Sequence, residues 1–233
     1  MRWLGVVLAV LAVVGTGWIS VGRAAETPGL EKGAREVVFT FDSWALRSYN
    51  GGIGIRYFVT DGLALRPGLD FGINDHSTHE TLAGSSGYQT DSTDTDNNSV
   101  GFSVYLEKYF AGFQKIAPFV AVGVAYTYTS SDNTSIHHTY AESVSDQDYW
   151  SDCAHSRQHN IDVIGAFGIQ WYFTDHICLG GQYNLAISHW WENSDRTEAI
   201  YRGSETEIRT IMSDDDGTST SLDAAKLMVS IRF

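Results

Sequence analysis

Histidine is the residue type whose spacing in this sequence most directly suggests metal chemistry. Six of the eight histidines fall in two polar stretches, residues 75–99 and 130–159. Neutral imidazole is a common ligand of transition metals, so His137, His138, His155 and His159 form a candidate metal site if the fold brings them together. The alternative is that they are solvated side chains of long loops.

A second candidate for metal binding is the acidic run at residues 94–98. Asp94 and Asp96 place carboxylates at alternate positions, as calcium-binding loops do. The run lacks the glycine at position six and the glutamate at position twelve that complete such a loop. Calcium binding therefore stays a hypothesis beside simple solvation.

Ser188, His189 and Glu192 offer the residue types of a hydrolase, a hydroxyl, an imidazole and a carboxylate. Enzymes that modify lipid A are one class of hydrolase that uses such groups. However, adjacent residues of a strand point to opposite faces, so Ser188 and His189 could not pair directly. We therefore predict that the protein is not an enzyme and needs no cofactor, with lipid A modification as a less favoured alternative.

The elements that must position these residues begin after an export signal. A single basic residue, Arg2, precedes an uncharged apolar run over residues 3–21, and small residues at 22 and 24 suit a cleavage site. We predict a signal peptide over residues 1–24 and a short periplasmic segment over residues 25–35. An uncleaved membrane anchor is the alternative.

The rest of the chain shows period-two hydrophobicity, which is typical of strands that place successive side chains on opposite faces. In the last segment, Leu227, Val229, Ile231 and Phe233 share one face, while Lys226 and Arg232 lie on the other. Seven further segments follow this pattern, at residues 37–46, 52–59, 63–74, 100–109, 119–129, 160–173 and 177–188. The sequence therefore predicts an all-β fold over residues 36–233, an eight-stranded antiparallel up-and-down transmembrane β-barrel. A soluble β-sandwich or lipocalin-like barrel is the alternative.

The connections between these segments alternate in length. Those at residues 60–62, 110–117 and 174–176 are short, whereas those at residues 75–99, 130–159 and 192–221 are long and carry 18 of the 28 acidic residues. Outer-membrane barrels have short periplasmic turns and longer extracellular loops. We therefore expect three long acidic loops outside the cell and both termini in the periplasm.

The polar faces of the predicted strands carry charges of both signs. Because the interior of an eight-stranded barrel is just filled by side chains, these charges should pair with one another in the lumen. The predicted network comprises Asp42, Arg56, Arg66, Asp70, Glu107, Asp162, Lys226 and Arg232. A narrow polar conduit, and hence a porin-like channel, is the alternative.

Two further features test the predicted topology. Cys153 falls in a long loop and Cys178 beside a short turn, so the two should lie at opposite ends of the barrel as free thiols. Pro67 lies inside a predicted strand and cannot donate a ladder hydrogen bond, so we expect a bulge there.

Several segments resemble the outer-membrane β-barrel domain family, which includes OmpA-like, OmpX-like and opacity-porin-like proteins. Residues 54–66 and 168–180 resemble its repeated phrase, in which an aromatic pair and a Thr-Asp turn join two strands. Residues 117–126 resemble its fifth strand. The resemblance implies that Val229, Ile231 and Phe233 form the signal read by the barrel-assembly machinery of a Gram-negative cell.

The composition narrows the functional classes without naming one. A net charge of −13 excludes nucleic acid as an expected partner, because phosphate binding needs a basic face. We expect an outer-membrane protein with a structural or adhesin-like role, in contact with outer-membrane lipid and lipopolysaccharide. An extracellular ligand would bind the long acidic loops.

Overall fold

A computed structural model describes residues 30–45, 48–84, 87–110, 115–141, 148–202, 205–222 and 226–233. The predicted signal peptide lies outside these residues. Nine strands form: β1 (Arg35–Ala45), β2 (Ser48–Thr60), β3 (Leu63–Gly84), β4 (Gly87–Tyr109), β5 (Ile116–Ala141), β6 (Asp148–Tyr172), β7 (Ile177–Arg202), β8 (Glu205–Leu222) and β9 (Lys226–Arg232). Within the described ranges, no helix is long and apolar enough to cross a membrane.

Eight of the strands close into an antiparallel ring. Each of β1–β7 pairs with the next along the chain, and β9 pairs with both β7 and β1. Strand β8 pairs with the outer part of β7, up to Leu185↔Leu222, and β9 pairs with its inner part, from Gln182↔Lys226. Together β8 and β9 therefore form the eighth strand. The prediction of an eight-stranded antiparallel barrel is confirmed.

The outward face of the ring is a continuous apolar band. Its side chains are exposed although they are large and hydrophobic, and they include Ile53, Ile55, Leu65, Leu69, Phe71, Val100, Phe102, Phe167, Ile169, Leu185, Leu227 and Ile231. The alternate residues face the lumen and are buried, as Arg56, Ala64 and Gln170 show. A wet surface would not carry such a band, whereas a lipid-facing one requires it.

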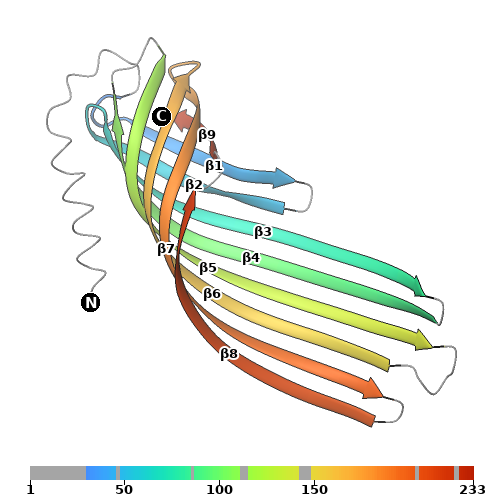
Figure 1. Ribbon diagram of the computed structural model, residues 1–233. Helices are drawn as coiled ribbons and strands as arrows, with labels where there is room; N and C mark the ends of the chain where they lie inside the picture. Colours follow the sequence, from blue (N-terminus) through green and yellow to red (C-terminus); the bar gives the residue numbers. More distant parts are fainter. Residues whose placement is uncertain are drawn as a thin grey trace.

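The three long connections are not loops, and this prediction was wrong. Strand β3 pairs with β4 out to Gly84↔Gly87, β5 with β6 out to Thr139↔Asp148, and β7 with β8 out to Arg202↔Glu205. Strand β4 also pairs with β5, and β6 with β7, over the same lengths. The three hairpins therefore join into one six-stranded sheet that continues beyond the barrel (Figure 1). We call its residues, 75–84, 87–98, 130–141, 148–159, 189–202 and 205–221, the outer sheet.

The outer sheet has two edges because the first hairpin of the barrel is short. Strands β1 and β2 end at Ala45↔Ser48, and the last pair between β2 and β3 is Ser48↔Asn74. Beyond Asn74, β3 pairs only with β4, and β8 pairs only with β7 along its whole length. In Figure 1, strands β3 to β8 extend past β1, β2 and β9. The ring is therefore closed within the barrel and open above it.

Pro67 causes no bulge, contrary to the prediction. The pairs Gly54↔Gly68 and Tyr57↔Leu65 lie on either side of it in the same register, and Pro67↔Val104 belongs to an unbroken ladder with β4. Between β2 and β3, the residue pairs next to Pro67 are absent, because their hydrogen bonds would require the N–H that proline lacks. The sheet therefore accommodates the proline by omitting hydrogen bonds to one neighbour without inserting a residue.

The chain before β1 covers the short-turn end of the barrel. Leu30 is buried, and its carbonyl accepts a hydrogen bond of 2.8 Å from the N–H of Gly62, whose positive φ of 70° forms the β2–β3 turn. The N–H of Gly33 donates to the carbonyl of Phe58, and that of Lys32 to the carboxylate of Asp61. Residues 30–34 therefore pack on the barrel and help to close its end.

Candidate functional site

A layer of charged side chains fills the lumen near the short-turn end. The Arg56 guanidinium, which is fully buried, contacts Glu36 at 2.5 Å and Glu107 at 2.6 Å. Glu107 also pairs with Arg66 at 2.5 Å and accepts a hydrogen bond from the Tyr109 hydroxyl at 2.7 Å. Because several strands contribute to the cluster, these contacts tie the ring together across its interior.

Amide and aromatic side chains complete this layer. Arg66 donates to the Gln182 side chain at 3.0 Å, and Gln182 donates to Asn184 at 2.6 Å. Beneath the charges, the Tyr109 ring contacts the rings of Phe58 and Phe119, with centroids 5.5 and 5.2 Å apart. All these side chains are buried. The lumen is therefore filled by protein at this level.

Seven of the eight predicted lumen residues fall into three groups. Arg56, Arg66 and Glu107 form the layer just described, and Lys226 pairs with Asp42 at 2.7 Å. Asp70 and Asp162 face a cavity above them, where Asp70 accepts a hydrogen bond from Ser103. Arg232 is half-buried near the chain end and lies outside these contacts. Sequence reasoning missed Glu36, because it stands at the boundary where the first strand begins.

The cavity above the charged layer opens toward the outer sheet. Its volume is about 340 Å³, and its lining is mostly polar. Carboxylates of Asp42, Asp70 and Asp162 share it with the Lys226 amine and with Asn184, whose buried Nδ2 has no hydrogen-bond acceptor. The charged layer closes the cavity below. The lumen therefore contains a polar vestibule with a floor.

The predicted histidine ligands do not meet in one place. His137 contacts Asp91 and stacks on Trp150, with ring centroids 5.6 Å apart. His155 pairs with Asp132 at 2.5 Å, several residues nearer the barrel. His138 lies opposite Tyr149, next to His137 and away from His155.

The fourth histidine, His159, belongs to an aromatic cluster at the top of the apolar band. Its Nδ1 lies 2.8 Å from the Tyr126 hydroxyl, and its ring stacks on Trp191 at 5.2 Å. Asp94 and Asp96 occupy regular ladder positions opposite Thr134 and Asp132. Among the described residues, no group of three or more potential ligands could hold a metal ion.

The family model for the outer membrane protein beta-barrel domain matches residues 30–191. The chain belongs to this family. It is thus an outer-membrane β-barrel protein, as the apolar band and the closed ring already indicate. No curated protein matches the sequence.

Several solved structures are similar to the chain. The N-terminal β-barrel domain of OprF from Pseudomonas aeruginosa is 16% identical, with a TM-score of 0.40, over 87% of this chain and 98% of that one. The outer membrane protein OprG from Pseudomonas aeruginosa is 12% identical, with a TM-score of 0.42, over 89% and 99%. A major outer membrane protein from Thermus thermophilus is 11% identical, with a TM-score of 0.40, over 86% and 98%.

Both cysteines of the chain are free thiols, as predicted. Cys153 is exposed on β6 in the outer sheet, whereas Cys178 is buried near the start of β7. The two positions are at opposite ends of the β6–β7 hairpin, since Cys153 pairs with Thr197 and Cys178 with Tyr172.

The three predicted assembly residues lie on the outward face at the end of the chain. Ile231 and Phe233 are exposed on the lipid-facing side, and Val229 is half-buried on the same face. This placement leaves the C-terminal side chains accessible from outside the barrel.

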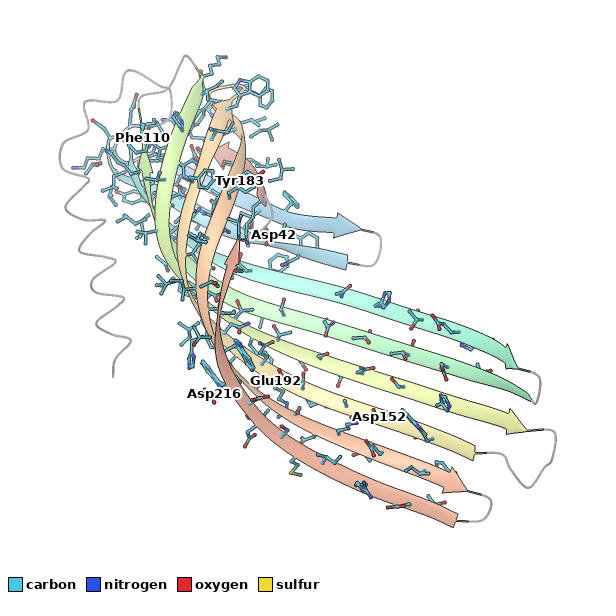
Figure 2. The ribbon with its side chains drawn as sticks, viewed as in Figure 1. Asp42, Phe110, Asp152, Tyr183, Glu192 and Asp216 are labelled. Carbon is cyan, nitrogen blue, oxygen red and sulfur yellow. The ribbon has the colours of Figure 1, made fainter. Side chains whose placement is uncertain are left out.

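Ser188 and His189 lie on opposite faces of β7. Ser188 lines the vestibule, whereas the ring of His189 contacts the carbonyl of Gly217 and lies near Trp191 on the outward face. The hydroxyl and imidazole therefore do not form a nucleophile and base pair. Figure 2 shows the side chains along the strands, with Asp152 and Glu192 on the outer sheet.

Proposed function

We propose that this outer-membrane protein is a surface-contact protein, in which a filled barrel anchors the outer sheet outside the cell. In this orientation the short turns and both termini face the periplasm. The observation that carries the proposal is the outer sheet itself. It consists of six strands that continue past the apolar band, and most residues on both of its faces are polar.

The composition of the outer sheet suits contact in water. Acidic side chains outnumber basic ones. Some of the acidic side chains form ion pairs, and Arg196 pairs with Asp152 at 2.8 Å and with Glu198 at 3.1 Å. The hydrogen bond to Asp152 raises the pKa of the Arg196 guanidinium above its ordinary value. A sheet of this size with two unpaired edges presents a large, ordered surface to a partner.

The filled lumen gives less support to a porin-like channel. A conducting path would have to pass Arg56, Glu36 and Glu107, whose side chains are at most 1% exposed and bound to one another. The vestibule reaches this layer from one side only. A barrel of this kind serves better as an anchor than as a conduit.

The partners we propose follow from the faces of the barrel. Outer-membrane lipid would cover the apolar band, and lipopolysaccharide would meet the aromatic cluster around His159 and Trp191 at its upper border. The barrel-assembly machinery would read the C-terminal residues. We propose no nucleic-acid partner, since the sheet outside the barrel is acidic.

Labelling of the native cysteines tests the orientation. A membrane-impermeant maleimide added to intact cells should label Cys153, which is exposed on the outer sheet, and should not label the buried Cys178. The Cys153→Ser variant should lose the signal. Labelling only after the cells are lysed would place the outer sheet in the periplasm and refute the proposal.

A further inference from the structure

The free edge of β8 differs from an ordinary protected edge. Native proteins usually blunt such strands with prolines, bulges or short lengths. Strand β8 is 18 residues long, contains no proline, and keeps one register with β7 throughout. Near its outer end, Ile208 is 67% exposed, Ile211 43% and Met212 77%. A strand edge without a partner, beside exposed apolar side chains, indicates a docking surface.

Two residues of opposite charge lie symmetrically about Ile208. Glu207 and Arg209 flank it, share one face of the strand, and are 66% and 64% exposed. When two identical copies of an antiparallel strand pair around a two-fold axis at Ile208, Glu207 of each copy lies opposite Arg209 of the other. Thr206 then lies opposite Thr210, and Ile208 opposite its own equivalent. Opposite charges and apolar pairs directly across a sheet are favourable.

Neighbouring registers lack this complementarity. Moving the two-fold axis by one residue places Arg209 opposite Arg209 of the second copy, or Glu207 opposite Glu207. Like charges directly opposite each other are destabilising. The other free edge, on β3, exposes no large hydrophobic side chain among residues 75–81, whose side chains the structure describes. The sequence of β8 therefore favours one register, at the edge best suited to pairing.

From this edge we infer that β8 pairs antiparallel with β8 of a second copy, over residues 205–211, with the two-fold axis at Ile208. This inference rests on the proposed function, in which the outer sheet lies outside the cell. Two copies in one membrane have β8 strands with the same direction along the membrane normal. Copies in two facing membranes have strands with opposite directions along that normal, so we place the antiparallel contact between neighbouring cells.

Charge reversal in the purified full-length protein tests the pairing directly. Self-association in detergent is measured by analytical ultracentrifugation over a range of concentrations. Glu207→Arg alone and Arg209→Glu alone should each weaken the dimer, roughly tenfold, because both cross-strand ion pairs become repulsive. The double variant should restore the dimer, and an equimolar mixture of the two single variants should form a heterodimer. Asp214→Arg is the matched control, since it makes the same charge change on β8 outside the paired segment.

Cysteine cross-linking tests the register. In a Cys153→Ser background, Ile208→Cys should give an oxidised dimer, because the two positions meet on the axis, and Ile211→Cys should not. The inference is overturned if the charge variants associate equally, if the mixture of single variants stays monomeric, or if Ile211→Cys cross-links better than Ile208→Cys. Circular dichroism verifies that each variant is folded.

Mixed cells separate this inference from the proposed orientation. Cells carrying Glu207→Arg should clump with cells carrying Arg209→Glu, and neither population should clump alone. If the purified proteins pair as expected but the mixed cells stay dispersed, the β8 pairing stands and its placement between facing membranes is wrong. If the charge variants show no pattern in detergent while Cys153 is labelled on intact cells, the proposed function stands and the β8 pairing is wrong.

Discussion

Replacement of Glu107 by alanine should destabilise the barrel more than any surface change. The Glu107 carboxylate is fully buried and contacts Arg56 at 2.6 Å, Arg66 at 2.5 Å and Tyr109 at 2.7 Å. Arg56 would keep Glu36 as its counter-ion, but Arg66 would keep only neutral partners, the Gln182 side chain and the Tyr105 ring. Removal of one member of a buried ion pair costs about 3–5 kcal/mol, since a charge is left without compensation. The free energy of unfolding of Glu107→Ala should therefore fall by about that amount.

The assay is urea unfolding of the refolded protein in lipid, followed by tryptophan fluorescence. The double variant Glu107→Ala/Arg66→Met should recover much of the loss, because it removes the uncompensated guanidinium along with the carboxylate. Glu198→Gln is the control, because its pair with Arg196 at the surface of the outer sheet should contribute less than about 1 kcal/mol. If Glu107→Ala unfolds within about 1 kcal/mol of the wild type, or if the double variant is no more stable than the single one, the charged layer is not a structural core.

Three further predictions follow from the same geometry. In planar bilayers the wild-type barrel should give no reproducible single-channel step, because the charged layer fills the lumen, and a steady unitary conductance would contradict that reasoning. Gly168→Ala should sharply lower the yield of folded protein, since its Cβ would clash with the Gly181 carbonyl oxygen, whereas Gly181→Ala meets nothing within 4 Å and should fold normally. Calorimetric titration with calcium, zinc or copper should give no saturable heat, as the described histidines and carboxylates do not converge, and a stoichiometric site would show that they rearrange.

The barrel could be predicted from the sequence because its two faces meet different solvents. Lipid on one side and a packed lumen on the other impose a period of two, as Leu227, Val229 and Ile231 show beside Lys226 and Ser230. The ring of eight strands and the separation of the two thiols followed from that period. The main members of the charged layer could also be predicted, since a charge on the inner face of a strand must pair with another charge inside the filled barrel.

The outer sheet escaped prediction because both of its faces are mostly polar. Where neither face is buried in lipid or core, hydrophobic alternation disappears, and the strand looks like a polar loop. The available signal was compositional. Residues 75–99, 130–159 and 192–221 contain no proline and are rich in threonine, a β-branched residue that suits strands. The partners of each histidine depended on the ladder register, which the sequence alone does not provide.

The short β1–β2 hairpin decides what the structure above the membrane can be. If β1 and β2 were as long as their neighbours, the ring could continue upward as a tube and extend the lumen. Because they end at Ala45↔Ser48, the other strands can only form an open sheet. An open sheet cannot enclose a conduit, but it has two edges and two accessible faces. The same feature that leaves the vestibule open on one side therefore also leaves one edge of β8 unpaired, which favours contact with other surfaces over transport through the barrel.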